Sequence, residues 1–475
     1  MTVRDEFMQD AYARIREAVS SNDNNSLDNG NALPPTLPQP SQLSRARRGR
    51  QATVDHLLED IAPALNGQNR SSRYWGFVTG AALPVAEVAD NLVSAYDQNV
   101  QVHLPNQTIA TEVEDAALKM LLGVLRLGSV DAWAGRTFTT GATASNILGL
   151  ACGREAVLAR RLSAAGCNGK TASELGILAA CLRAGVKEIR VLTSMGHSSL
   201  SKAASIVGLG SATVHELPHS ADEPWRLDLE AVQKELQREG AACIIVLSAG
   251  ELLASSRALS PETDEFSGLH RAAAGLELAD SITVDGHKLL NVPYDCGVFF
   301  TRQVSTLTSV CQNPNAVYLN SEASDIQSPL NVGLENSRRF RALPAYAVLL
   351  SEGREGLADM FARMVRLTRG IAGVVRDSPD YILLPDEQGQ EHGADLEDTH
   401  ICVLFRARED SLNNVLVEAI NATGLWYVSS TKWKGQKAVR VAVANWRINV
   451  TEDQELVRQS LASIAQEHKT AESKS

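Results

Sequence analysis

A lysine directly after a histidine is the residue of this chain best suited to covalent chemistry. Lys288 closes the run Asp285-Gly286-His287-Lys288, which follows the short β-branched segment 282–284. Such a segment, bounded by turn formers, predicts a buried strand that presents the lysine from rigid backbone. Burial disfavours an ammonium ion, and a free amine can add to a carbonyl group. Taken alone, a surface lysine just past a strand end is the competing interpretation.

A second segment has the composition of an anion-binding turn. The run Gly141-Ala-Thr-Ala-Ser-Asn146 follows a predicted strand and opens a predicted helix. Small residues let backbone N–H groups approach an anion, and a helix N-terminus attracts negative charge. An ordinary strand-to-helix turn is equally consistent with this segment taken alone. In the company of Lys288, a phosphate site is favoured, with Ala142, Thr143 and Ser145 as its predicted contacts.

The elements that must position these residues alternate between β-rich and helical segments. This alternation predicts an α/β fold with a mostly parallel sheet covered by helices. A smaller α+β domain is expected to follow, and residues 1–70, 71–340 and 341–475 are the expected N-terminal helix with linker, large domain and small domain. The predicted strands are 136–139, 188–193, 243–247, 281–285 and 296–300, then 401–405 and 438–444. The predicted helices are 54–61, 85–96, 112–127, 144–164, 199–207, 266–274, 339–369 and 452–466.

Composition limits the classes of function. The net charge is 45 − 56 = −11, which disfavours a general nucleic-acid binder. The seven cysteines are odd in number and scattered, which favours a reducing compartment, and no segment has the apolar length of a membrane span. We therefore expect a cytoplasmic protein without membrane or nucleic-acid partners. No metal is expected, because Asp285 with His287, and His215 with His219, lack a full ligand set.

Five motifs in order along the chain resemble those of the group II pyridoxal-phosphate-dependent amino-acid decarboxylases, the family of aromatic-amino-acid, tyrosine, histidine and glutamate decarboxylases. Ordered matches over roughly residues 70 to 350 are far more specific than any single motif, and the last hundred residues match more loosely. The motifs are Tyr74-Trp-Gly-Phe77, Thr139-Thr-Gly-Ala-Thr-Ala-Ser-Asn146, Gly196-His-Ser-Ser-Leu-Ser-Lys202, the His287-Lys288 run and Asn336-Ser-Arg-Arg-Phe-Arg-Ala-Leu343.

This resemblance implies a pyridoxal-phosphate enzyme of fold type I that decarboxylates an L-amino acid to an amine and carbon dioxide, as a homodimer. It assigns the Schiff base with pyridoxal 5'-phosphate to Lys288, ring stacking to His197, and a place against the phosphate or site wall to His287. It assigns proton return to Tyr318, in a mobile loop whose tyrosine reaches the neighbouring subunit. It also gives the run 337–339 a part in framing the site.

The chain departs from the family just before the lysine strand. The family carries there an additional strand whose aspartate keeps the pyridine nitrogen protonated, and no such strand is found. Only 281 − 249 + 1 = 33 residues separate the flanking strands, which leaves room for one crossover of about a dozen residues or more. Asp285 is too close to Lys288 to serve in its place, and Asp264 and Asp280 are surface candidates. A catalytically silent scaffold or dimer partner is therefore one alternative function, and another carbon–carbon lyase of the same fold is a second.

Overall fold

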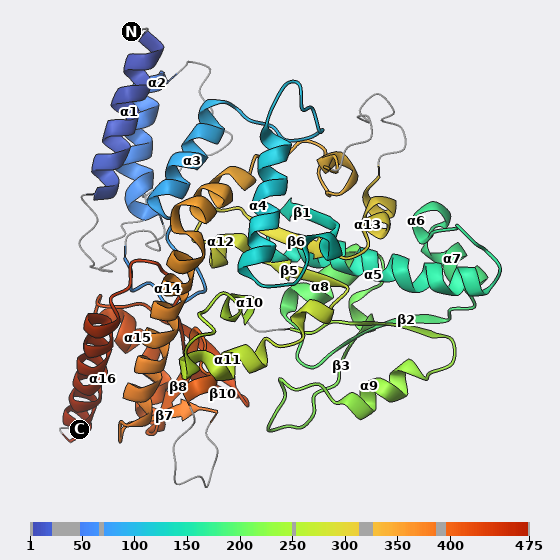
Figure 1. Cartoon of the computed structure of the whole chain (residues 1–475). Helices are drawn as coiled ribbons and strands as arrows, with labels where there is room; N and C mark the ends of the chain where they lie inside the picture. Colours follow the sequence, from blue (N-terminus) through green and yellow to red (C-terminus); the bar gives the residue numbers. More distant parts are fainter. Residues whose placement is uncertain are drawn as a thin grey trace. The chain divides into compact units, whose positions relative to one another are not determined.

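The computed structural model describes residues 3–20, 48–65, 71–248, 253–312, 326–385 and 396–473. These residues form two compact units, one made of 1–81 with 362–475 and the other of 82–361. Figure 1 shows the elements of each unit coloured along the chain. The division expected from the sequence, at residues 70 and 340, stays a prediction of domain organisation.

The unit 82–361 contains the strands and helices predicted around Lys288. Its strands are β1 (Gly135–Thr139), β2 (Glu188–Thr193), β3 (Val214–Glu216), β4 (Ala241–Ile245), β5 (Ser281–Val284) and β6 (Gly297–Thr301). Its helices are α3 (Pro84–Ala95), α4 (Ala110–Val124), α5 (Ala142–Ala164), α6 (Ala172–Leu175), α7 (Ile177–Ala184), α8 (Ser198–Ile206), α9 (Leu229–Leu236), α10 (Leu253–Ser256), α11 (Ser267–Ala272), α12 (Gly286–Leu289) and α13 (Val304–Cys311). The five strands predicted here are confirmed, whereas β3 and the short helices α6, α7, α9, α10, α12 and α13 were not predicted.

The strands of this unit form two three-stranded sheets. One has the order β3-β2-β4 with both pairs parallel, as expected for a crossover fold. The other has the order β1-β6-β5, in which β6 is antiparallel to both neighbours. Strands β1 and β5 therefore run in the same direction, and β6 is reversed between them.

Strands β4 and β5 each have a single strand neighbour among the described residues. Between them the described part of the chain forms α10, α11 and short 3-10 turns. Helix α5 packs against both strands. A Cβ on its Gly149 would lie 3.6 Å from Phe299 of β6, and one on its Gly153 would lie 3.1 Å from Ile244 of β4. One helix thus packs against a strand of each sheet, and the absence of a side chain at Gly153 lets it approach β4 closely.

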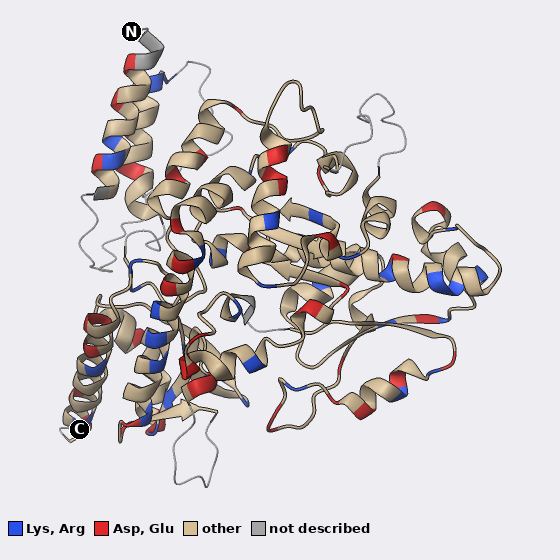
Figure 2. Cartoon of the chain, viewed as in Figure 1, with Lys and Arg blue, Asp and Glu red and all other residues tan. Residues whose placement is uncertain are grey.

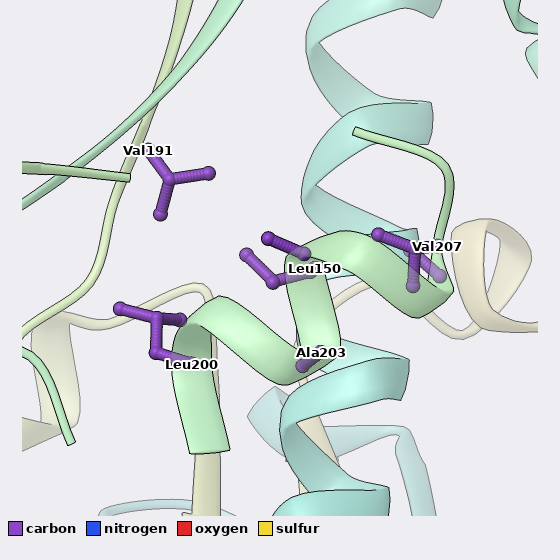
Figure 3. Packing of buried hydrophobic residues seen from close by; sticks show 7 residues of the cluster. Leu150, Val191, Leu200, Ala203 and Val207 are labelled. Carbon is purple, nitrogen blue, oxygen red and sulfur yellow. The ribbon is translucent and has the colours of Figure 1, made fainter. Parts of the chain in front are cut away.

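A buried apolar cluster holds α8 between α5 and β2. Its fully or nearly buried members include Leu150 of α5, Val191 of β2 and Leu200 of α8. Figure 3 shows these side chains gathered with Ala203 and Val207 of α8. Burial of apolar side chains at this density fixes the start of α8, and so the residue just before it.

The other unit is α+β, as predicted for the C-terminal region. Its antiparallel sheet has the order β7-β8-β10-β9. The strands are β7 (Tyr381–Leu384), β8 (Cys402–Ala407), β9 (Ser429–Trp433) and β10 (Gln436–Ala442), and the helices are α1 (Val3–Ser20), α2 (Arg50–His56), α15 (Asp410–Ala422) and α16 (Val450–Glu472). Helix α14 (Ala342–Arg376) begins in one unit and ends in the other, with non-helical backbone at Gly353.

The charged residues are interspersed rather than separated by sign. Figure 2 shows residues of both signs on the same helices, among them α9 and α14. None of the helices in the described ranges is both long and apolar enough to cross a bilayer.

Candidate functional site

Lys288 lies one turn beyond the end of β5. Asp285 follows the strand with extended backbone, and the chain then enters the four-residue helix α12, which carries the lysine. The Lys288 side chain is 25% exposed, and its Nζ forms an ion pair with Asp285 Oδ2 at 3.0 Å. The strand predicted to deliver the lysine is confirmed, and the short helix adds the turn that folds the amine back over Asp285.

Asp285 connects the lysine to the first turn of α5. Its Oδ1 accepts a hydrogen bond from the Ala142 N–H at 2.5 Å, while Oδ2 pairs with Lys288. The carboxylate is 12% exposed and also satisfies a helix N-terminus. The sequence suggested only that Asp285 could not serve the pyridine nitrogen. Its three-residue spacing from Lys288 was the signal for an ion pair, but nothing local indicated the contact with Ala142.

The first turn of α5 is shaped for close approach by an anion. Gly141 has a φ of +153°, and a Cβ at Gly297 would lie 2.4 Å from the Gly141 Cα. The N–H groups of Thr143 and Ala144 have no hydrogen-bond acceptor among the described residues. Two backbone donors at a helix N-terminus can therefore bind an anion beside the Asp285 contact.

Ser145, the third predicted contact in this turn, points into the protein. It is fully buried, its Oγ donates to the Val298 carbonyl at 3.1 Å, and the Thr139 hydroxyl lies 2.8 Å away. These bonds tie α5 to β1 and β6. The predicted contact of Ser145 with a cofactor stays a prediction, and its observed role is to hold the turn.

His287 is a buried neutral donor beside the same carboxylate. Burial lowers its pKa from the ordinary value, an effect that the charge of Asp285 opposes. Its Nδ1 accepts from the Cys296 N–H at 3.3 Å, so the proton resides on Nε2, which lies 3.7 Å from Asp285 Oδ1. The structure thus brings His287, Lys288 and Ala142 together around Asp285.

Tyr294 is a member of this cluster that the sequence did not single out. Its ring lies 4.4 Å from the His287 ring, between centroids. Burial, followed by the charge of Asp285, raises the pKa of its phenol to about 12. The phenol is therefore neutral at physiological pH and can donate a hydrogen bond.

His197 occupies the position predicted for it, between β2 and a helix. It is the N-cap of α8, and its Nδ1 accepts from the Ser199 N–H at 3.2 Å. The preceding Gly196 donates its N–H to Glu216 of β3 at 3.0 Å. The residue is exposed, so its ring is accessible, and the hydrogen bonds of that ring in the described residues run to Ser199.

The other predicted positions have separate outcomes. Tyr318 lies outside the described residues. Arg338 and Arg339 of the 337–339 run bind Glu114 and Asp90 through ion pairs of 2.6 Å each. These pairs attach the segment to α4 and α3, which supports a framing role.

The remaining predictions concern the two aspartates named as surface candidates, the possible metal ligands and the first family motif. Asp264 and Asp280 are exposed, as expected of surface residues. In the ranges that the structure describes, no three His, Cys, Asp or Glu side chains group as metal ligands. The Tyr74–Phe77 motif lies in the other unit, where Tyr74 stacks on Tyr427 at 4.7 Å between ring centroids.

Comparisons with known proteins show which enzymes this chain is similar to. The pyridoxal-dependent decarboxylase conserved domain matches residues 248–391, which include the Lys288 run. An L-2,4-diaminobutyrate decarboxylase of Acinetobacter baumannii is 26% identical over 363 residues, 68% of this chain and 67% of that protein. Tryptophan decarboxylase 1 of Oryza sativa subsp. japonica is 23% identical over 458 residues, 87% of this chain and 82% of that protein.

A solved structure gives the fold. The crystal structure of Oryza sativa TDC with PLP and tryptamine superposes with a TM-score of 0.75 at 20% identity, covering 98% of this chain and 99% of that one. The predicted fold-type-I architecture, a large unit with a parallel sheet and a smaller α+β unit, is confirmed by this likeness.

The residues present fit pyridoxal 5'-phosphate, the cofactor of this family. Lys288 supplies an accessible primary amine, and the open N–H groups of Thr143 and Ala144 supply an anion site. Asp285 bonds to the Lys288 amine and to the Ala142 N–H at the start of the same turn, so the amine and the anion-binding turn are neighbours. A molecule that carries both an aldehyde and a phosphate matches that pair of groups.

Proposed function

We propose that this chain, which belongs to the group II pyridoxal-phosphate-dependent decarboxylase family, removes the α-carboxylate of an L-amino acid and releases an amine and carbon dioxide. One observation carries the proposal: Asp285 contacts both the Lys288 amine, at 3.0 Å, and the first turn of α5, at 2.5 Å. The covalent and anionic attachment points of the cofactor are thereby neighbours.

Each residue of the site has a definable task. Lys288 attaches the cofactor through its amine, and Asp285 holds that amine in place. Thr143 and Ala144 hold the phosphate with backbone N–H groups, and His287 borders it with Nε2–H. When bound, pyridoxal phosphate supplies an electron sink for the pair of electrons left when the bond to the carboxylate breaks.

Two further residues complete the proposed chemistry. The exposed imidazole of His197 is assigned to cover the cofactor ring, with Nε2–H available to a substrate carboxylate. Tyr318 is assigned to return the proton to the substrate carbon, a role that rests on the family resemblance.

The attachment residue is tested by reduction and peptide mapping. Protein loaded with pyridoxal phosphate and treated with borohydride is expected to carry one pyridoxyl group, on the peptide that contains Lys288. Lys288→Ala should lose both the label and the visible absorbance of the bound cofactor. Lys170→Ala, at an exposed surface pair with Glu174, is the matched control and should keep both. A label on another lysine would refute the assignment.

A catalytically silent scaffold is the second candidate, favoured by one specific observation. In the described residues no strand lies between β4 and β5, where the family resemblance places the aspartate of the pyridine nitrogen. Loss of a buried charge partner costs about 3–5 kcal/mol, which is roughly two to three and a half decades of rate if expressed in the transition state.

Carbon dioxide release separates the two candidates. The panel should include L-2,4-diaminobutyrate and L-tryptophan, the substrates named for relatives of this chain. Turnover that depends on Lys288 supports the decarboxylase. Labelling of Lys288 without turnover on any amino acid supports the silent scaffold.

The chain is further proposed to act as a homodimer. Exposed apolar side chains on α3 and its C-cap residue recur at i, i+4 and i+8: Val88 is 61% exposed, Leu92 48% and the C-cap Tyr96 80%. Such a stripe on one helix face is typical of an association surface. Light scattering after size-exclusion chromatography should give twice the chain mass, and Leu92→Glu should shift the population toward monomer. A monomer at micromolar concentration would exclude this proposal.

A cytoplasmic location is proposed on the basis of cysteine chemistry. All seven cysteines are free in the structure, as expected for a reducing compartment. Fractionation of cells that express the full chain tests this location, and recovery in a secreted or membrane fraction would contradict it.

A further inference from the structure

A chain of side-chain hydrogen bonds runs from β5 through α5 to His197. The Thr283 hydroxyl of β5 donates to Asn146 Oδ1 at 3.3 Å, and Asn146 Nδ2 donates to Ser199 Oγ at 3.0 Å. Ser199 Oγ in turn lies 2.7 Å from His197 Nδ1. This series of hydrogen bonds begins at Thr283, two residues before Asp285, and ends at the exposed imidazole of His197.

The direction of every bond in this chain follows from one donor that cannot reverse. The Ser199 backbone N–H points at His197 Nδ1, 3.2 Å away, so Nδ1 must be an acceptor. The Ser199 hydroxyl must then donate to the same nitrogen. Because that hydroxyl donates its only proton to His197, its lone pairs accept from the Asn146 amide N–H.

The same residues connect two sheets that share no backbone ladder in the described part of the chain. Thr283 belongs to the β1-β6-β5 sheet, and α8 follows β2 of the β3-β2-β4 sheet. Asn146, on the helix that covers both, bonds to each side. Its amide therefore sets how α8 and its N-cap are placed against the strand that leads to Lys288.

We propose that Asn146 is a positioning residue that strengthens the His197 tautomer with its proton on Nε2, which the Ser199 backbone N–H already requires. It does so by directing the Ser199 hydroxyl toward Nδ1. The consequence for catalysis rests on the proposed function: Nε2–H is the edge that the ring presents to a substrate carboxylate. Among the described residues the Asn146 side chain bonds to Ser199 and Thr283 and not to Lys288 or Asp285, so it acts through Ser199.

The tautomer can be measured on the cofactor-free full chain. Nitrogen NMR of ¹⁵N-histidine-labelled protein distinguishes a protonated from an unprotonated ring nitrogen, and the spectrum of His197→Gln identifies the His197 signals. We expect an unprotonated Nδ1 and a protonated Nε2 at pH 8. A protonated Nδ1 in the unaltered protein would overturn the proposal.

Asn146→Asp is the discriminating variant. A carboxylate cannot donate, so the Ser199 hydroxyl should turn toward it and leave Nδ1 with the Ser199 backbone N–H as its one donor. The His197 Nδ1 signal should then shift away from its position in the unaltered chain, toward that of an unprotonated nitrogen that accepts fewer hydrogen bonds. Asn421→Asp alters a comparably half-buried amide of the other unit, bonded to Val428, and should leave the His197 signals unchanged. Identical His197 signals in Asn146→Asp and the unaltered chain would also overturn the proposal.

Kinetics supply a second, graded measurement. Loss of one directed hydrogen bond corresponds to roughly a two- to tenfold effect, so Ser199→Ala and Asn146→Asp should each lower kcat/KM by about that factor. Thr283→Val keeps the shape of the residue and removes only the most distant donor, so its effect should be smallest. Absence of Lys288-dependent turnover would count against the proposed function, while the NMR result would still decide the tautomer.

Discussion

Gly297→Ala should separate the first turn of α5 from β6 and weaken the site without touching a reactive group. Gly297 begins β6 and pairs with Thr139 of β1. The added Cβ would lie 2.4 Å from the Gly141 Cα, 2.6 Å from its N and 2.6 Å from Thr139 Oγ1. Two of these three atoms belong to backbone, so no rotation of a flexible side chain relieves the contact.

The size of the effect follows from those distances. Non-bonded carbons rest about 3.5–4.0 Å apart, so the turn and the strand must separate by roughly 1 Å. Overpacking of this kind costs about 1–3 kcal/mol of unfolding free energy. The displaced turn also loses part of a charge–dipole attraction of about 0.3–2 kcal/mol, which predicts roughly a two- to thirtyfold weaker affinity for pyridoxal phosphate.

A second glycine of the same region gives the matched control. A Cβ on Gly149, inside α5, would meet Phe299 at 3.6 Å, an ordinary contact. Gly149→Ala should therefore raise stability by about 0.5–1 kcal/mol through helix propensity. Urea denaturation and cofactor titration measure both variants. Equal midpoints for Gly297→Ala and the unaltered chain, with unchanged cofactor affinity, would refute the packing argument.

Three other perturbations test the energetics of the same unit. Burial lowers the pKa of His287 in the folded protein. The stability that the neutral imidazole contributes is therefore present above the unfolded pKa of about 6.5 and is lost as pH falls toward the folded pKa. The urea midpoint of His287→Gln should fall less between pH 7 and 5 than that of the unaltered chain, and parallel curves of midpoint against pH would contradict this. Glu114→Gln removes the ion pair of Arg338, whose side chain is 1% exposed, and should lower the free energy of unfolding by about 3–5 kcal/mol. The double variant Glu114→Leu with Arg338→Met should recover part of that loss in the same assay. An equally unstable double variant would argue against an uncompensated charge as the cause. Buried Glu155 accepts from the N–H groups of Ala172 and Ser173 at 2.7 and 2.9 Å, so Glu155→Gln should lose about 1–3 kcal/mol, whereas Glu174→Gln on the exposed face should stay near the unaltered value.

Local patterns predicted the strands of the unit 82–361 except β3, and its long helices, whereas β7, β9 and α15 of the other unit were not predicted. Strand β2 has the bounds predicted for it, and α5 and α8 begin within two residues of expectation. Apolar spacing, β-branched content and the glycine before α5 act between residues close in sequence, so they can be read directly. The short elements β3, α6, α7, α12 and α13 carry too few residues for a periodic signal, and tertiary packing decides them.

The features of the site likewise separate into those predicted from the sequence and those that only the tertiary structure revealed. The sequence by itself predicted Lys288 as the reactive amine and the 141–146 turn as an anion-binding segment, and it placed His197 before a helix, as the structure has it. Only the tertiary structure decided that Asp285 bonds to Ala142, 143 residues away, and that Asn146 bonds to Ser199, 53 residues away. It also placed Tyr294 against His287 and left β4 and β5 in separate sheets. Side chains so distant in sequence meet according to strand order and register, which depend on how all the elements pack together rather than on any local pattern.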